Sequence, residues 1–174
     1  MLFFLGKPMN IYVVMGVSGC GKSSVARMLA TATGGTFYDA DDFHTPENKR
    51  KMSSSVQLND SDRWNWLESL NQELKKHAAD QQPTFLACSA LRRTYRKHLA
   101  NGLEKVGFIY LQGSRDCIRR RLAERKNHFM PPELLESQFQ TLEEPSSDEA
   151  IIVSVENPLE DIVKMVLADL KIER

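Results

Sequence analysis

The segment from Gly16 to Ser23 has the residue types and spacing of a phosphate-binding loop. It fits the pattern GxxxxGKS/T, with three glycines followed by Lys22 and Ser23. Glycines allow a tight turn whose successive amide groups face an anion, and a helix that follows points its positive end at the same anion. Lys22 is expected to reach the β- and γ-phosphates of ATP, and the Ser23 hydroxyl to bind Mg²⁺. The residues expected to contact the nucleotide here are Gly16, Ser18, Gly19, Cys20, Gly21, Lys22, Ser23 and Ser24.

An acidic cluster that includes one histidine spans residues 39–44, directly after an apolar run. Phosphoryl transfer to an alcohol needs a carboxylate that orients the hydroxyl and accepts its proton, whereas transfer to an existing phosphate does not. Asp41 is therefore a candidate base for a hydroxyl acceptor. The alternative is structural, because aspartates often form turns or cap helices and a lone histidine such as His44 is often an ordinary polar residue.

Two sets of cations are candidates for binding anions. Lys51 and Arg63 lie on either side of the middle of the polar stretch that follows Asp39 and are candidates to bind an anionic acceptor, whereas Lys49 and Arg50 fit a solvated helix face. Farther along the chain, an arginine-rich helical pattern begins at residue 115. Two of its arginines, Arg121 and Arg125, are four residues apart and share one face. We expect them to reach the phosphates of ATP, Arg125 as a catalytic residue, and Arg119 and Arg120 to face solvent.

The third apolar run ends at Cys88 and Ser89, without the acidic residue that binds Mg²⁺ in many motor ATPases and GTPases. Ser89 has two open roles, as a contact for the acceptor or for a metal-bound water, and as the cap of a following helix that begins near Leu91. Trp64 and Trp66 are two residues apart, so one can pack while the other faces the cleft or solvent.

Five apolar runs predict the strands that position these residues, at 11–15, 36–38, 84–88, 108–111 and 151–154. Helical patterns alternate with them, so we expect an α/β fold with a parallel sheet and helices on both faces. One predicted helix includes Trp66, has cap candidates between Asp60 and Asp62, and closes near Gln82. Ligands of such sheets gather at the carboxyl ends of the strands. The polar stretch 39–62 is too long for a simple connection and is expected to hold an acceptor.

Length and composition narrow the class of protein. The 174 residues suit a single domain, 1–174, and the formal net charge of zero provides no general attraction for nucleic acid or an anionic membrane. We expect neither as a partner. The three cysteines lack metal-ligand spacing and are interpreted as reduced thiols, which favours a cytoplasmic location. The apolar start, residues 1–5, lacks the features of a signal peptide.

Taken together, these motifs resemble the gluconokinases, which phosphorylate D-gluconate with ATP. The resemblance covers nearly the whole chain, in residues 15–23, 39–44, 48–52, 58–63, 88–96, 108–111, 128–131 and 137–143. It implies a P-loop kinase fold with a five-stranded parallel sheet, a small helical acceptor-binding insertion at about 39–80, a lid at about 125–132, and a homodimer. It also implies ATP and Mg²⁺ as cofactors.

The resemblance assigns roles to individual residues. Asp41 becomes the expected base or hydroxyl orienter, and Arg121 and Arg125 are expected to face ATP. The implied acceptor contacts are Asp41, His44, Lys51, Arg63 and Arg92. D-gluconate combines a carboxylate, which suits Lys or Arg, with hydroxyl groups, which suit Asp and His, so the chemistry of this set agrees with the substrate.

The chain departs from the family pattern at two places in the acceptor segment. Residues 54–58 read Ser-Ser-Val-Gln-Leu where the pattern is SGxPL, and Asn65 replaces the usual Pro before the second Trp. These changes alter loop stiffness or retune the pocket toward a related sugar acid. Two alternatives are a kinase of another small hydroxylated acid, of shikimate type, and a nucleotide-binding module that performs no chemistry.

Overall fold

A parallel five-stranded sheet forms the centre of the computed structural model, which describes residues 9–124 and 132–170. The strands are β1 (Ile11–Met15), β2 (Thr36–Asp39), β3 (Thr84–Ala87), β4 (Gly107–Gln112) and β5 (Ile151–Ser154). Their order across the sheet is β2-β3-β1-β4-β5, and every pairing is parallel. All five strands were expected from the apolar runs, with bounds that differ by at most one residue.

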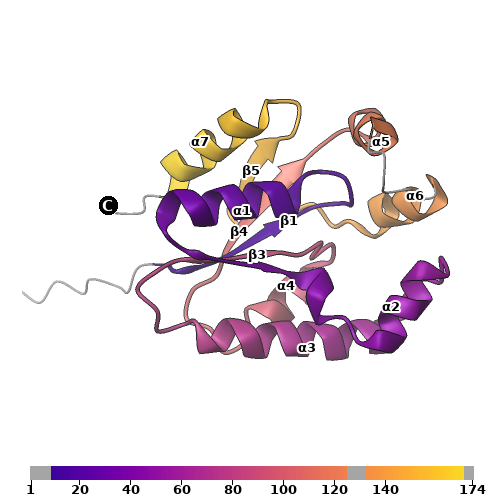
Figure 1. Ribbon diagram of the computed structural model, residues 1–174, viewed down its shortest axis with the longest axis horizontal. Coiled ribbons are helices and arrows are strands. Elements are labelled where there is room, and N and C mark those ends of the chain that lie inside the picture. Colours follow the sequence, from indigo (N-terminus) through magenta and orange to yellow (C-terminus); the bar gives the residue numbers. More distant parts are fainter. Residues whose placement is uncertain (1–8, 125–131, 171–174) are drawn as a thin grey trace, which may run out of the picture.

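Helices cover both faces of the sheet, as predicted (Figure 1). Helices α1 and α7 lie over one face, and α3 and α4 over the other. The helices are α1 (Lys22–Thr33), α2 (Pro46–Ser53), α3 (Asp60–Lys76), α4 (Arg93–Leu99), α5 (Arg115–Glu124), α6 (Pro132–Thr141) and α7 (Leu159–Leu170), with a short 3₁₀ helix, η1 (Ala40–Phe43). Within residues 9–124 and 132–170, no helix has both the length and the apolar composition needed to cross a bilayer.

The two faces are held by separate apolar clusters. One contains Val25 and Leu29 of α1 with Ile162 of α7, and the other contains Leu67 and Leu70 of α3. Central strand β1 contributes to both because its side chains alternate between the two faces and all five of its residues are buried. This rigid centre holds the carboxyl ends of the strands, and so the residues that follow them, in a fixed arrangement.

The acceptor segment forms two helices, and only the second was given bounds from the sequence. Helix α2 begins after Thr45, whose side chain accepts a hydrogen bond from Asn48 N, and has Pro in its first turn. Helix α3 is capped by Asn59, whose side chain accepts from Asp62 N, and the Asp62 side chain accepts in turn from Asn59 N. The expected cap between Asp60 and Asp62 was therefore placed one residue too late. Helix α3 also ends at Lys76, well before Gln82.

One of the two roles left open for Ser89 is excluded. Helix α4 begins at Arg93 with Arg92 as its N-cap, so Ser89 does not cap it. Helix α6 begins at Pro132, a position in the first turn that proline suits. The predicted lid at about 125–132 lies outside the described residues apart from Pro132, and so does Arg125.

The departure at Ser55 has a measurable cost in stability. Ser55 adopts φ 56°, the left-handed conformation that favours glycine, directly after α2. Replacing Ser55 with glycine removes the strain but adds freedom to the unfolded chain, so we expect the free energy of unfolding to rise by about 0.5–1 kcal/mol. Urea denaturation measures this change. Ser54, at φ −91°, is the matched control, and an equal gain in Ser54→Gly would contradict the explanation.

Candidate active site

The phosphate loop lies between β1 and α1, at the carboxyl edge of the sheet. Gly21, with φ 99°, leads into α1 without a side-chain cap, so the first N–H groups of the helix remain available to an anion. The Lys22 ammonium donates a hydrogen bond to the Val17 carbonyl at 3.0 Å, across the loop. Cys20 N donates to the same carbonyl at 3.3 Å, and the Cys20 side chain is buried. The loop is thus preorganised around the position that phosphates would take.

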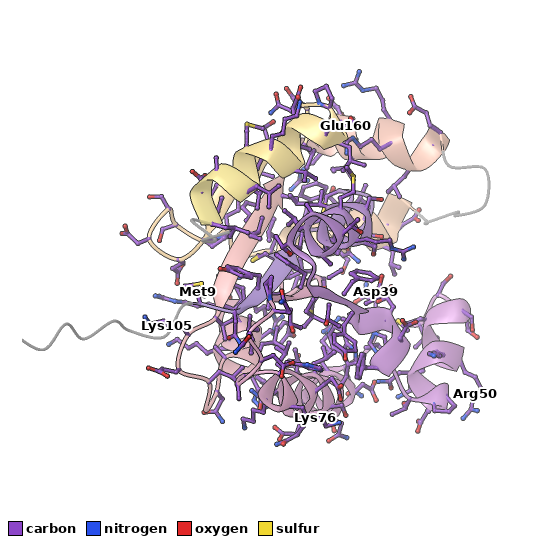
Figure 2. The ribbon with its side chains drawn as sticks, turned by 60° about the vertical axis from the view of Figure 1, so that its left-hand side comes forward. Met9, Asp39, Arg50, Lys76, Lys105 and Glu160 are labelled. Atoms are coloured by element: carbon purple, nitrogen blue, oxygen red, sulfur yellow. The ribbon has the colours of Figure 1, made fainter. Side chains whose placement is uncertain are left out.

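Asp39 is a site residue that the sequence reasoning did not select. It is the last residue of β2, and its Oδ2 accepts a hydrogen bond from the Ser23 hydroxyl at 2.6 Å. Its Oδ1 accepts from Asp41 N at 3.1 Å, so the same carboxylate also shapes η1. Figure 2 shows Asp39 on the side of the molecule that carries Arg50, with Met9 and Lys105 toward the opposite end. Its position at the carboxyl end of a strand was the signal available in the sequence.

The Ser23 and Asp39 pair fits a Mg²⁺ site. A hydroxyl and a carboxylate are oxygen ligands, and Mg²⁺ commonly uses one or two such protein groups together with phosphate oxygens and water. Among the described residues, no three His, Cys, Asp or Glu side chains come together as a metal cage. This arrangement suits a metal that arrives with the nucleotide.

Asp41 and His44 lie together on η1 and just after it. The Asp41 side chain is 86% exposed, and its Oδ1 is 4.0 Å from His44 Nε2. The His44 ring is buried and stacks on Trp66, with 4.3 Å between ring centroids. Trp66 Nε1 donates to the Ala40 carbonyl at 2.7 Å, which fixes the indole beneath η1. Trp66 is buried, whereas Trp64 is 38% exposed. One tryptophan therefore packs and the other faces solvent, as expected.

Burial lowers the pKa of the His44 imidazole to about 4, and the positive charge of Lys49 acts in the same direction. The ring is therefore neutral at pH 7. Its Nδ1 is buried and has no hydrogen-bond partner among the described residues. A ligand hydroxyl is one group that would satisfy this nitrogen.

The lowered pKa of His44 predicts a loss of stability in acid. The unfolded chain, with an ordinary histidine pKa near 6.5, binds a proton that the native state excludes until about pH 4. The free energy of unfolding should thus fall by about 2–3 kcal/mol between pH 7 and pH 4.5 through this residue, and not change above pH 7. In His44→Phe, which keeps an aromatic ring against Trp66, denaturant titrations should show a shallower pH dependence. Equal slopes in the two proteins would contradict the prediction.

Arg63 and Arg92 converge, as the acceptor assignment requires. Arg63 Nη1 lies 3.8 Å and Arg92 Nη1 3.7 Å from the same oxygen, Asp60 Oδ1. Tyr95 donates its hydroxyl hydrogen bond to this oxygen at 3.1 Å. Asp60, expected only as a cap candidate, thus holds two cations in one place. A ligand carboxylate would find paired guanidinium groups there.

The turn that carries Arg92 is held by a buried cation. Arg96 is 5% exposed, and its Nη1 donates to the carbonyls of Ala90 at 3.1 Å and Leu91 at 3.3 Å. Ala90 adopts φ 45°, a conformation that costs energy for a residue with a side chain. Ser89, at the start of this turn, accepts a hydrogen bond from Gly16 N through its carbonyl at 3.3 Å. The turn therefore links the phosphate loop to Arg92.

Lys51 is placed differently from the other predicted acceptor contacts. Its ammonium lies 2.9 Å and 3.0 Å from the two carboxylate oxygens of Asp62 and 3.6 Å from Glu47. Hydrogen bonding to Asp62 raises the pKa of Lys51, so the group is firmly cationic. Its charge is already engaged by the cap of α3, and its role toward an acceptor stays a prediction.

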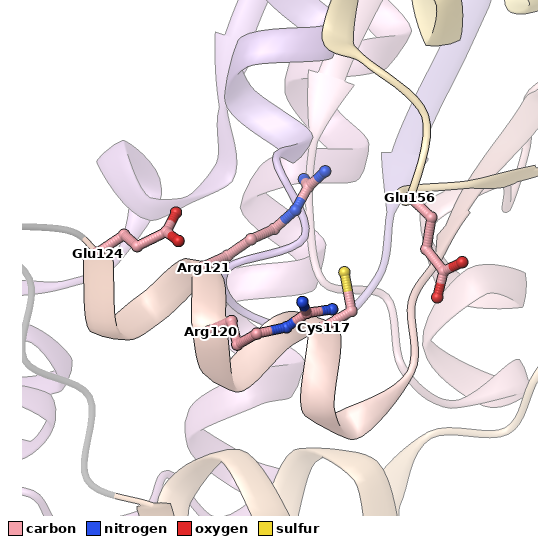
Figure 3. A pocket seen from close by; sticks show the side chains of 5 residues that line it. All are labelled: Cys117, Arg120, Arg121, Glu124 and Glu156. Atoms are coloured by element: carbon pink, nitrogen blue, oxygen red, sulfur yellow. The ribbon is translucent and has the colours of Figure 1, made fainter.

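Arg121 lies beside the phosphate loop, as predicted. Its guanidinium donates to the Val155 carbonyl, and its Nη1 would be 3.8 Å from a side-chain carbon placed on Gly21. Arg121 also lines a cavity of about 340 Å³ (Figure 3). The other lining residues are Cys117, Arg120, Glu124 and Glu156. Arg119 and Arg120 are both exposed, as expected. Arg120 lines this cavity, and Arg119 lies 3.8 Å from both Asp116 and Glu136.

A second cavity, of about 360 Å³, lies beside the first turn of α1. Ser23, Ser24 and Arg27 line it together with Met28 and Leu159. Ser24, predicted to contact the nucleotide, is therefore accessible next to the loop. The predicted nucleotide contacts of the phosphate loop therefore lie near Arg121. Arg125 lies outside the described residues.

Comparisons with known proteins identify the family of the chain. A family model described as shikimate kinase matches residues 18–171. The chain is 46% identical to the probable gluconokinase of Mus musculus, over 93% of this chain and 98% of the mouse protein. It is 41% identical to the thermoresistant gluconokinase of Escherichia coli, over 93% and 94% of the two chains. The chain belongs to the gluconokinase family.

A solved member of the gluconokinase family has the same fold. The gluconokinase from Sinorhizobium meliloti superposes with a TM-score of 0.84 at 42% identity, over 92% of this chain and 91% of that one. The predicted P-loop kinase fold is thus confirmed by both sequence and structure, and the protein is an enzyme of the kinase class.

The structure explains how the chain accommodates its departures from the gluconokinase pattern. Ser55 takes the glycine-like conformation described above, and Gln57, at the proline position, donates its side-chain amide to Ser137 Oγ at 3.0 Å. Asn65 lies within α3, and its carbonyl accepts from Ser69 Oγ at 3.0 Å. None of these three residues touches Asp41, His44 or Arg63 through a described hydrogen bond. The departures therefore act on the ends and stiffness of the acceptor segment.

Proposed function

We propose that the protein transfers the γ-phosphoryl group of ATP to D-gluconate, forming 6-phospho-D-gluconate and ADP. The observation that carries this proposal is the meeting, at one edge of the sheet, of a phosphate loop with an acceptor segment whose side chains suit a polyhydroxy carboxylate. Membership of the gluconokinase family supports the same acceptor.

Acceptor recognition divides between the two ends of the substrate. Arg63 and Arg92, already converged on Asp60, bind the carboxylate through charge-assisted hydrogen bonds. Neutral His44 and the carboxylate of Asp41 bind hydroxyl groups. A substrate that lacks the carboxylate leaves the arginines unmatched, so specificity for a sugar acid follows.

Asp41 orients the 6-hydroxyl group and accepts its proton as that oxygen bonds to the γ-phosphorus. The bond between the γ-phosphorus and the β–γ bridging oxygen breaks at the same time, and ADP keeps the electron pair. Lys22 stabilises the negative charge on the phosphoryl oxygens, with the loop N–H groups and Arg121. Ser23 and Asp39 would hold Mg²⁺, which supplies further charge neutralisation when bound.

The nucleoside end of ATP is assigned to the cavity next to Arg121. This cavity adjoins the phosphate loop, and Arg120 and Arg121 bring positive charge to its wall. Glu124 and Glu156 add polar acceptors for base or ribose groups. Arg125, four residues after Arg121 in the sequence, is proposed to complete the contacts with the phosphates.

Cytoplasmic location and a homodimeric state also belong to the proposal. Cys20, Cys88 and Cys117 are free and buried, as is usual in a reducing compartment. Burial raises the pKa of Cys88 to about 12, so it is an unreactive thiol. Analytical ultracentrifugation tests the homodimer, and a single species with the mass of one chain would exclude it.

A coupled ADP-release assay tests the function. The purified protein is incubated with MgATP and, separately, D-gluconate, related sugar acids, shikimate and nucleoside monophosphates. We expect turnover with D-gluconate well above every other acceptor. Preference for another sugar acid would leave the kinase assignment in place but overturn the substrate, and ATP binding without acceptor-dependent turnover would indicate a binding module.

A further inference from the structure

Gln138, on helix α6, contacts the phosphate loop directly. Its Oε1 accepts a hydrogen bond from Ser18 N at 2.6 Å, in a partly buried position. A main-chain N–H can only donate, so this contact fixes the amide with Oε1 toward the loop and Nε2 away from it. A phosphate loop binds anions through the directions of its N–H groups. A side chain that holds one of these groups therefore influences how the loop is presented to a nucleotide.

The neighbouring residue, Ser137, contacts the acceptor segment. Gln57 Nε2 donates a hydrogen bond to Ser137 Oγ at 3.0 Å, between residues 80 positions apart. Proline, which the family pattern has at position 57, carries no side-chain donor. The contact is thus specific to the glutamine of this chain. Two adjacent residues of α6 join the segments that take the two substrates.

Helix α6 contacts the core and neighbouring elements through several side chains. Leu135 is 3% exposed and belongs to the core, and Glu136 pairs with Arg115 of α5. Directly after the helix, Glu143 N donates to the Leu91 carbonyl at 2.8 Å, in the turn that carries Arg92. A continuous set of contacts thus joins the acceptor segment to the phosphate loop through α6.

We propose that Gln138 is a positioning residue for the phosphate loop and that Gln57 and Ser137 couple the loop to the acceptor segment. The coupling rests on the proposed function, because it takes ATP and D-gluconate as the two ligands. The hydrogen bond between Gln57 and Ser137 is neutral and exposed. A bond of this kind can change the affinity for one ligand, when the other binds, by at most about fivefold. Gln138 touches the loop itself and is better shielded from water, so its removal has the larger effect.

Gln138→Met tests the positioning role, because methionine keeps the length of the side chain and removes the acceptor. Calorimetry without any acceptor should show the Kd for MgATP raised about fivefold to tenfold, and the lost hydrogen bond should lower the thermal midpoint by only about 2–4 °C. Gln140→Met is the matched control, since Gln140 is exposed on the same helix, and it should bind MgATP like the wild type. Unchanged binding in Gln138→Met would overturn the proposal. Tighter binding would also overturn it, because Gln138 would then compete with phosphate.

A double-mutant cycle on Gln57 and Ser137 tests the coupling. The KM for ATP is measured at low and at saturating D-gluconate in the wild type, Gln57→Ala, Ser137→Ala and the double variant. The wild-type KM for ATP should change by up to about fivefold between the two conditions. Either single substitution should abolish most of this change, and the double variant should add nothing further.

Val56→Ala controls for disturbance of the loop and should keep the wild-type coupling. The proposed coupling would be overturned if the wild-type KM for ATP did not depend on D-gluconate. It would also be overturned if the effects of the two single substitutions simply added in the double variant. If the wild type does not phosphorylate D-gluconate, the proposed function fails, whereas the MgATP affinity of Gln138→Met still decides the positioning role. The two failures are therefore distinguishable.

Discussion

Replacing Lys22 with methionine is expected to lower kcat/KM for ATP by about 10³-fold or more with any acceptor. The substitution keeps most of the side-chain length and removes the charge that faces the phosphates. Donors aimed at developing charge in a dry site commonly contribute 10²- to 10³-fold each, and a charged donor contributes more. Steady-state ADP release with D-gluconate measures the loss.

The structure identifies a second effect that must be separated from the first. Lys22 also donates to the Val17 carbonyl, so the variant loses a loop contact as well as a charge. Thermal unfolding reports the structural part, which should be about 1 kcal/mol, the usual contribution of such a hydrogen bond. Lys49→Met removes an exposed cation of the acceptor segment and should leave ATP turnover almost unchanged. Full activity in Lys22→Met would exclude the phosphate-loop interpretation.

Replacing Asp41 with asparagine is expected to reduce kcat by about 10²- to 10⁴-fold, the range that a general base contributes. The amide can still bind a hydroxyl but cannot accept its proton. Because Asp41 points from η1 and the nucleotide contacts come from other elements, the Kd for MgATP should stay within about threefold of the wild type. Single-turnover phosphorylation and calorimetry measure the two quantities separately.

The neighbouring aspartates provide matched controls for Asp41. Asp42→Asn changes an exposed residue of the same 3₁₀ helix and should keep nearly normal turnover. Asp39→Asn should instead weaken MgATP binding, because this carboxylate accepts the Ser23 hydroxyl. Normal turnover in Asp41→Asn together with a collapse in Asp39→Asn would move the role of base to Asp39.

Most of the fold could be predicted from local pattern. Each strand is a short apolar run, and the alternation of strands and helices leaves few parallel arrangements. The bounds of helix α2 were not predicted because only Asn48 of its eight residues is buried, so no apolar periodicity marks its ends. Helix α6 was missed because it begins at a proline that also reads as a helix terminator.

The site was predicted only in part, because local pattern does not show contacts between separate elements. The roles of Lys22 and Ser23 follow from one contiguous motif, and Arg121 follows from helical spacing. Asp39 was noticed as part of the acidic cluster but not selected, because its contact with Ser23 joins two different elements. The place of Asp60 between Arg63 and Arg92 depends on how α3 packs beside the turn after β3.

By itself, the sequence determined the strands, the phosphate loop and the family. These depend on side-chain type, short spacing and backbone preference, which neighbouring residues decide. Only the tertiary structure decided that His44 is buried and neutral, that Lys51 is engaged by Asp62, and that α6 joins Gln57 to Ser18. Burial, pKa and such contacts depend on which distant elements pack together, and a chain position alone does not contain that information.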